Sequence, residues 1–255
     1  MELLHTTEMR VTFGGVHAVD SVDFSVEEGK IVGLIGPNGA GKTTFIDGIT
    51  GFVPTTGSIR FRDREISHLP AHRRSHLGLA RTWQSLELFE DLDVTENLRV
   101  AAEEQSALGF FADLFVPQRR RSHANVDFTL DVLGIRDLAH RMPTELSQGQ
   151  RKLVSTARAL AARPRLLCMD EPAAGLDTSE SEELGRRMRH ILDAGITIFL
   201  VDHDMGLVLS VCDYIYVIEF GRTIAQGTPV EIKRDPMVIA AYLGSDKSSD
   251  KSADR

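Results

Sequence analysis

Apolar residues in the N-terminal part of the chain follow the spacing of β-strands. They alternate with polar residues or form short runs between glycine-containing breaks. The predicted strands are Met9–Phe13, Val22–Val26, Ile31–Ile35 and Ser58–Phe61. The third strand runs directly into Gly36, so the pattern predicts a strand, a glycine-rich loop and then a helix from Thr43.

The spacing of apolar residues changes to that of helices from about Asp91 to Ala162. Apolar side chains recur every three or four positions and line one face of each predicted helix. These faces consist of Val94, Leu98 and Ala102 in one helix, and of Val126, Leu130 and Leu133 in another. The stretch of about seventy residues is therefore predicted to be a helical insert.

The second half of the chain returns to strands. The apolar runs Leu166–Met169 and Ile196–Val201 are typical of strands buried on both faces of a parallel sheet. The amphipathic segment Ser179–Leu192 lies between them and completes a βαβ unit. Tyr214–Phe220 and Thr223–Gln226 flank a Gly-Arg turn and predict a hairpin. The last residues, 244–255, are polar and predict a disordered tail.

Composition narrows the class of protein. The chain has 255 residues, of which 42% are hydrophobic, and this suffices for one sizeable core. The net charge of −8 argues against a broad surface for nucleic acid. Cys168 and Cys212 have neither disulfide nor zinc-site spacing, so a reduced, cytosolic setting is expected. No apolar run approaches the roughly 18 residues of a membrane helix, so any membrane role is expected to come through a partner.

The loop after the third strand fits the phosphate-loop pattern GxxxxGK[ST]. It consists of Gly36, Pro37, Asn38, Gly39, Ala40, Gly41, Lys42, Thr43 and Thr44. Glycines let backbone N–H groups surround phosphates, and the following helix directs its positive end at them. Lys42 should reach the β- and γ-phosphates of ATP, the Thr43 hydroxyl should ligate Mg²⁺, and Thr44 should hold the α-phosphate. A chance match is expected in only about 1% of chains of this length.

Two carboxylates end the apolar run that begins at Leu166. At the C-terminal end of a strand, Asp170 can hold the metal through water and Glu171 can polarise the attacking water. Taken alone, the same pattern also describes an ordinary strand that ends in an acidic turn. The phosphate loop upstream favours the catalytic interpretation.

The segment Leu146–Gln150 opens a helix that ends before Pro164. Ser147 with Gln150 three positions later forms a capping box, which would explain the residues structurally. The same physics also allows a phosphate clamp, because a helix N-terminus and a serine hydroxyl both favour an anion.

The order of the motifs GPNGAGKTT, Gln84, LSQGQ, LLCMDE, AGLD and His203 resembles the ABC-transporter ATPase family over nearly the whole chain, from about Leu3 to Leu243. The resemblance implies an α/β fold: a P-loop NTPase (RecA-like) core with an N-terminal antiparallel β subdomain and an inserted α-helical subdomain. The core would comprise residues 1–90 and 160–243, and the helical subdomain residues 91–159. Two ATP molecules would lie between two head-to-tail subunits, with Ser147, Gly149 and Gln150 acting on the ATP of the opposite subunit.

The resemblance also implies roles for four isolated residues. Gln84 corresponds to the glutamine that senses Mg²⁺ and the water, His203 to the histidine at the γ-phosphate, and Asp177 to the aspartate at the dimer seam. Phe13 corresponds to the aromatic residue that stacks on adenine, although tyrosine is commoner there and core packing is the alternative. The chain departs from the family at Gln148, where the signature LSGGQ has glycine; in the first helical turn φ is negative, so glycine is not required.

Within the family, the chain resembles the branched-chain amino-acid uptake ATPases. The shared features include Arg81-Thr-Trp-Gln, Asp170-Glu-Pro-Ala-Ala-Gly-Leu and Ala241-Tyr-Leu-Gly. The resemblance implies an ATP-hydrolysing subunit at the cytoplasmic face of the membrane. Its partners would be a second ATPase subunit (identical or not), membrane permease subunits and, indirectly, a periplasmic or lipid-anchored substrate-binding protein, with no nucleic acid.

Other functions stay open at this point. A urea or amide importer and a lipopolysaccharide-type exporter share the same motifs, and a soluble non-transport ABC protein is a further alternative. A GTP switch protein is disfavoured because the chain lacks an Asn-Lys-x-Asp motif. The insert from Ala107 to Ala124 carries Phe110, Phe111, Leu114 and Phe115, which would pack either near a membrane subunit or within the helical lobe.

Overall fold

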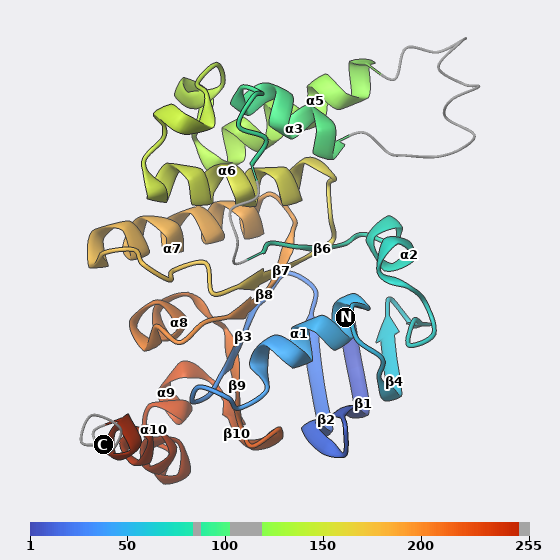
Figure 1. Cartoon of the computed structure of the whole chain (residues 1–255), viewed down its shortest axis with the longest axis vertical. Coiled ribbons are helices and arrows are strands. Elements are labelled where there is room, and N and C mark those ends of the chain that lie inside the picture. The colour runs from blue at the N-terminus through green and yellow to red at the C-terminus, as the bar shows by residue number, and fades with distance from the viewer. Residues whose placement is uncertain (84–87, 103–118, 250–255) are drawn as a thin grey trace.

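The computed structural model describes residues 1–83, 88–102 and 119–249. It contains two β-sheets with helices packed around them (Figure 1). The first sheet is antiparallel and has the order β2-β1-β4-β5. Its strands are β1 (Glu2–Phe13), β2 (Val16–Glu27), β4 (Thr56–Phe61) and β5 (Arg64–Glu65).

The second sheet has the order β10-β9-β3-β8-β7-β6. Its strands are β3 (Ile31–Ile35), β6 (Leu79–Arg81), β7 (Leu166–Asp170), β8 (Thr197–Val201), β9 (Tyr214–Glu219) and β10 (Arg222–Gly227). All neighbours are parallel except β10, which forms a hairpin with β9. Every residue of β3, β7 and β8 is buried, and for β7 and β8 this was predicted from their apolar runs.

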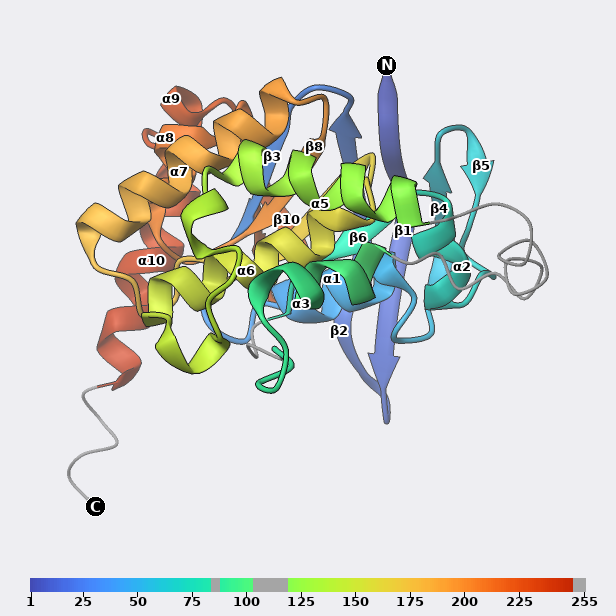
Figure 2. The ribbon, with the colours of Figure 1, turned by 90° about the horizontal axis from the view of Figure 1, so that it is seen from above.

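Some helices pack against the second sheet, and others form a separate layer at one end of the molecule (Figure 1). The helices are α1 (Lys42–Thr50), α2 (Ala71–His76), α3 (Val94–Ala102), α5 (Arg119–Leu133), α6 (Gln148–Ala161), α7 (Thr178–Asp193), α8 (Met205–Val211), α9 (Pro229–Ile232) and α10 (Pro236–Ser249). Figure 2 shows α3, α5 and α6 lying together, and the predicted apolar faces of α3 and α5 are buried there. Among the described residues, no helix is long and apolar enough to cross a bilayer.

The parallel register brings the ends of three strands to one edge of the sheet. Ile31 pairs with Ile198, and Leu166 pairs with Thr197, so β3, β8 and β7 end side by side. The segments that follow these strands begin at Gly36, Asp202 and Glu171. Residues far apart in the sequence therefore meet at this edge, where α/β proteins bind their ligands.

The structure differs from the sequence prediction at the N-terminal strands. β1 and β2 are both longer than predicted because bulges interrupt the alternation of apolar residues. Glu8 and Ser21 have left-handed backbone angles, with φ of 46° and 55°, and mark these irregularities. A search for strict alternation misses strands that are broken in this way.

The C-terminal segment also differs from its prediction. Helix α10 extends to Ser249, so residues 244–249 are helical where disorder was expected; residues 250–255 lie outside the described residues. The helix is anchored by buried Val238 and Ala241 in its first half. Once the first turns are packed, adding further polar residues costs little.

Candidate functional site

The phosphate loop makes a tight turn that only glycine fits at two positions. A Cβ atom on Gly36 would lie 2.1 Å from the carbonyl oxygen of Ile218, and one on Gly41 would lie 2.2 Å from that of Ala18. Gly41 also has a left-handed φ of 100° at the start of α1. The N-terminus of α1 thus begins on glycine, whose lack of a side chain leaves its first N–H groups accessible to an anion.

Lys42 lies inside the loop. Its Nζ donates to the carbonyl oxygens of Gly36 at 2.8 Å and Pro37 at 3.1 Å, and the residue is 6% exposed. Burial lowers the pKa of Lys42, while the carboxylates of Glu171 and Asp170 oppose that effect. The ammonium group therefore has carbonyl partners that phosphate oxygens can replace.

The tip and the exit of the loop face solvent. Asn38, Gly39 and Thr43 are exposed, whereas Thr44 is half-buried and Ala40 is buried. The arrangement leaves the Thr43 hydroxyl accessible to a ligand at the start of α1.

Asp170 is the last residue of β7, and its two carboxylate oxygens have different surroundings. Its Oδ2 accepts a hydrogen bond from Arg81 Nη2 at 2.8 Å. Its Oδ1 is buried and has no hydrogen-bond partner among the described residues. Burial raises the pKa of Asp170, and the Arg81 guanidinium opposes that effect. A carboxylate oxygen in this state, together with the Thr43 hydroxyl, offers the oxygen donors that Mg²⁺ prefers, directly or through water.

Glu171 has a strained backbone. Its φ is 46°, and its N–H donates to the carbonyl oxygen of Val201 at 2.7 Å, which fixes this conformation. The side chain is 20% exposed, and its Oε1 lies 3.8 Å from Nδ1 of His203. The structure therefore brings together the two side chains that the sequence predicts to act on the attacking water and the γ-phosphate.

Asp202 holds the backbone around these two residues, and the sequence analysis did not identify it. The carboxylate is fully buried. Oδ1 accepts from the N–H of His203 at 2.7 Å and of Asp204 at 3.0 Å, and Oδ2 accepts from the N–H of Ala173 at 3.0 Å. A charged residue directly after a buried strand was the available signal in the sequence.

The capping box at the start of α6 is confirmed. Ser147 Oγ accepts from the N–H of Gln150 at 3.3 Å, and Gln150 Oε1 accepts from the N–H of Ser147 at 3.0 Å. Gln148 is the first residue of α6 and has a negative φ, as predicted. Its side-chain amide lies near Gly175 of the same chain.

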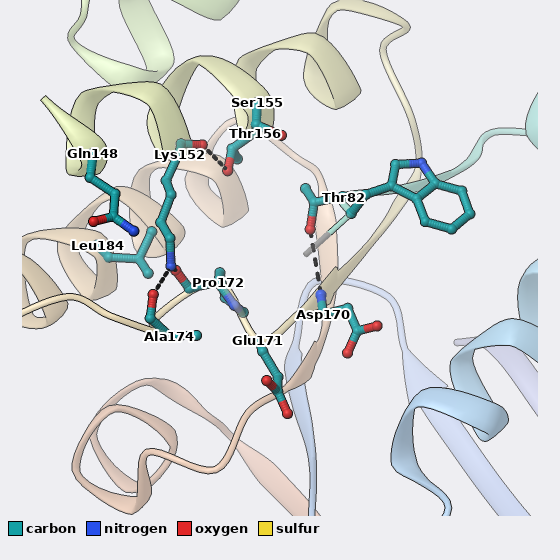
Figure 3. Close-up of a pocket in the computed structure, with 11 residues that line it drawn as sticks. Thr82, Gln148, Lys152, Ser155, Thr156, Asp170, Glu171, Pro172, Ala174 and Leu184 are labelled. Carbon is teal, nitrogen blue, oxygen red and sulfur yellow. Dashed lines mark hydrogen bonds between the residues drawn. The ribbon is translucent and has the colours of Figure 1, made fainter. Parts of the chain in front are cut away.

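A pocket separates α6 from the segment after β7 (Figure 3). Lys152 extends across it from α6, and its Nζ donates to the carbonyl oxygens of Pro172 at 3.0 Å and of Ala174. Burial lowers the pKa of Lys152. Glu171 points away from Lys152, on the opposite side of the segment. Lys152, which the sequence pattern did not single out, thus attaches α6 to the backbone segment that carries Glu171.

The remaining predicted residues have separate positions. Asp177 caps α7, since its Oδ1 accepts from the N–H of Glu180 at 2.8 Å. Phe13 is 51% exposed at the end of β1, which excludes core packing. Gln84 and the apolar residues of the insert (Phe110, Phe111, Leu114 and Phe115) lie outside the described residues.

The C-terminal helix also reaches the phosphate loop. Burial raises the pKa of Tyr242 to about 12, and the nearby Gly36 backbone opposes that shift. The contact joins α10 to the first residue of the loop. Nothing in the sequence pattern indicated this proximity, because the two residues lie far apart in the chain.

Comparison with known proteins extends these observations. The family model described as "ABC transporter" matches residues 19–174, and the model "Branched-chain amino acid ATP-binding cassette transporter" matches residues 222–248. The chain is 40% identical over 249 residues to the high-affinity branched-chain amino acid transport ATP-binding protein BraF of Pseudomonas aeruginosa, with 95% of this chain and 98% of that protein covered. It is 39% identical over 249 residues to LivG of Salmonella typhimurium, with the same coverage. It is 36% identical over 247 residues to the lipopolysaccharide export system ATP-binding protein LptB of Escherichia coli, with 96% and 99% covered.

Solved structures give the same result. The ADP conformation of MJ1267, an ATP-binding cassette of an ABC transporter, matches with a TM-score of 0.85 and 32% identity, covering 96% of this chain and 99% of that one. A nucleotide-free ATP-binding cassette from an ABC transporter matches with a TM-score of 0.83 and 32% identity, covering 95% and 99%. The predicted P-loop NTPase fold and the predicted family are confirmed, and the chain belongs to the ABC transporter family as an ATP-hydrolysing cassette.

Proposed function

We propose that the chain is the ATP-hydrolysing subunit of an importer that takes up branched-chain or other hydrophobic amino acids through separate membrane subunits. The observation that carries the transported class is the match of residues 222–248 to the branched-chain cassette model. The similarity to BraF and LivG over nearly the whole chain supports it. The 36% identity to LptB keeps a lipopolysaccharide-type exporter as the second candidate.

The chemistry begins with the phosphates of ATP entering the loop. Lys42 exchanges the carbonyl oxygens of Gly36 and Pro37 for phosphate oxygens, and the N-terminus of α1 contributes backbone N–H groups. Phe13 is proposed to stack on the adenine, because its ring is exposed at the end of β1 in the antiparallel β subdomain. Binding in this way fixes the γ-phosphate at the edge where β3, β7 and β8 end.

Hydrolysis then requires an oriented water and stabilised charge. Glu171 accepts the proton of the attacking water, and His203, 3.8 Å away, contacts the γ-phosphate. Mg²⁺, when bound, neutralises charge on the phosphates; Thr43 and, through water, Asp170 would hold it, and Gln84 would sense it. The buried carboxylate of Asp202 holds the segments of Glu171 and His203 together, because it accepts hydrogen bonds from the N–H groups of Ala173 and His203.

The site is proposed to be completed by a second ATPase subunit. Ser147, Gly149 and Gln150 lie at the solvent-facing start of α6, where a helix N-terminus and a hydroxyl favour phosphate. They would contact the ATP of the opposite subunit, and Asp177 would lie at the seam. The partner is either a second copy or a sister ATPase. The pair would bind permease subunits at the cytoplasmic face of the membrane, with a periplasmic or lipid-anchored binding protein supplying the substrate.

Co-purification and transport test this function. Affinity-tagged chain, isolated from detergent-solubilised membranes, should retain permease subunits, and cells lacking it should lose uptake of radiolabelled leucine. Restoration by the wild-type chain but not by Glu171→Gln would tie uptake to hydrolysis. Recovery with lipopolysaccharide-export subunits supports the second candidate, and recovery with ribosomes or DNA contradicts transport altogether.

A further inference from the structure

Two exposed aromatic rings lie against the guanidinium of Arg81, which also donates a hydrogen bond to Asp170. Phe52 and Trp83, here called the aromatic pair, are 53% and 43% exposed. Their ring centroids are 4.7 Å apart at an interplanar angle of 81°. The Arg81 guanidinium lies 4.4 Å from the Trp83 centroid and 5.9 Å from that of Phe52. Both rings are therefore within the range of cation–π attraction to one guanidinium.

The same guanidinium reaches the interior on its other side. The Arg81 side chain is 6% exposed. Nη2 donates to Asp170 Oδ2 at 2.8 Å, and Nη1 donates to Asp47 Oδ1 on α1. A planar guanidinium that is hydrogen-bonded to two carboxylates has little rotational freedom. The position of Arg81 therefore determines the orientation of the Asp170 carboxylate.

The orientation matters because only one oxygen of Asp170 is left for a ligand. Oδ1 is buried and without a hydrogen-bond partner among the described residues, whereas Oδ2 is held by Arg81. If the guanidinium were removed, a buried carboxylate would lose its principal partner and its fixed direction. Partners of this kind, which bond to metal-holding carboxylates, typically change metal affinity by about 10- to 100-fold when mutated.

We propose that Arg81 is a positioning residue that orients Asp170 toward Mg²⁺ and links this carboxylate to the exposed aromatic pair. The inference rests on the proposed role of Asp170 in holding the metal. It adds a route by which a change at the surface rings reaches the metal site: displacement of either ring shifts the guanidinium, and the guanidinium moves the carboxylate. A purely structural ion pair would stabilise the fold but leave metal affinity unchanged.

The chain carries a built-in reporter for this link, because Trp83 is its only tryptophan. Mg²⁺ is titrated into the full chain saturated with a non-hydrolysable ATP analogue while Trp83 emission is recorded. Metal affinity is measured independently with Mn²⁺ by electron paramagnetic resonance of the free ion. Wild type should show a metal-dependent change in Trp83 emission, and Asp170→Asn should abolish it.

Arg81→Met should raise the half-saturating Mn²⁺ concentration about 10-fold or more, with nucleotide affinity in EDTA unchanged. Trp83→Ala leaves the buried ion pair in place and should raise the half-saturating Mn²⁺ concentration about 2- to 5-fold, the range expected when an exposed cation–π contact is lost. Phe89→Leu is the matched control: Phe89 is 42% exposed and its ring centroid lies 4.9 Å from the guanidinium of Arg158, whereas the cation–π partners of Arg81 among the described residues are Phe52 and Trp83. Its metal affinity should equal that of wild type.

The variants distinguish a wrong role for Asp170 from a wrong role for Arg81. If Asp170→Asn binds Mn²⁺ with the affinity of wild type, the proposed role of Asp170 fails. If Asp170→Asn weakens Mn²⁺ binding but Arg81→Met binds Mn²⁺ as wild type does, the positioning role of Arg81 is overturned. If Asp170→Asn weakens Mn²⁺ binding but wild-type Trp83 emission does not respond to Mg²⁺, the link to the aromatic pair is overturned. If Arg81→Met does not fold, Trp83→Ala decides the link, and metal affinity equal to that of Phe89→Leu overturns it.

Discussion

Lys152 offers the most direct test of whether the attachment of α6 to the Glu171 segment affects hydrolysis. Its ammonium donates to the carbonyl oxygens of Pro172 and Ala174, which follow Glu171 in the chain. Lys152→Met keeps the apolar stem of the side chain and removes only the donor. Both carbonyl groups lie beside a pocket that admits water, so part of the lost bonding is replaced by solvent.

The expected size of the effect follows from the number and kind of bonds. A hydrogen bond from a charged donor contributes about 1.5–3 kcal/mol, and water recovers part of the two that are lost. A net loss of about 1.5–3 kcal/mol in the arrangement of α6 against the Glu171 segment corresponds to a decrease in kcat of roughly 10- to 100-fold. The KM for ATP should change little, because Lys152 lies on α6 and not on the phosphate loop.

Steady-state ATPase assays on the assembled ATPase pair measure both constants. Lys152→Arg, which retains a donor of similar reach, should recover most of kcat, and thermal unfolding should show that all variants are folded. A kcat for Lys152→Met within twofold of wild type would refute the reasoning, because the hydrogen bonds from Lys152 would then have no effect on catalysis by Glu171. An equal loss in Lys152→Arg would also contradict it, since bulk rather than hydrogen bonding would be responsible.

Three further predictions concern other parts of the molecule. Glu171→Gln should bind ATP normally and lose roughly 10²- to 10⁴-fold in hydrolysis, accumulating a closed dimer on size-exclusion chromatography; normal turnover would exclude Glu171 as the base. Gly41→Ala should lower the free energy of unfolding by more than about 1 kcal/mol and weaken ATP binding, because its Cβ would lie 2.2 Å from a carbonyl oxygen; unchanged urea unfolding would contradict this. Glu65 has its pKa lowered from 4.5 to about 2: burial raises it, but hydrogen bonds from Ser58 and Ser67 outweigh that effect. Since the folded-state pKa is depressed, its stabilisation is complete above pH 4.5 and is lost as the pH falls toward 2, so Glu65→Gln should have a flatter dependence of unfolding free energy on pH in that range.

Much of the fold could be predicted from local patterns. The buried strands β7 and β8 are short apolar runs, and their bounds in the sequence differ from the structure by one residue. The helices α3 and α5 bury the faces that the periodicity indicated. β1 and β2 were predicted too short because left-handed residues at Glu8 and Ser21 break the alternation. A bulge depends on pairing with the neighbouring strand, and a single-strand pattern contains no information about it.

The candidate site shows the same division between local and non-local information. The phosphate loop and the capping box of α6 are local motifs, so their residues could be identified from spacing alone. The contacts of Arg81, Lys152 and Asp202 join residues on different elements, and each becomes visible only when the strand ends meet. Buried charged groups of this kind require partners, but the sequence does not say which.

The backbone of α6 explains why Gln148 can replace the glycine of the signature LSGGQ. The first turn of a helix has a negative φ, so the backbone N–H that would face a phosphate does not depend on glycine at this position. The side chain has to be placed elsewhere, and it lies toward Gly175 of its own chain, on the same segment that Lys152 holds. Gln148→Gly should therefore leave the capping box intact and loosen only the contact with that segment. If nucleotide-dependent dimerisation of Gln148→Gly matches wild type while its amides at residues 172–176 exchange faster, the glutamine acts within its own chain; a change in dimerisation alone would place its role at the opposite subunit's ATP.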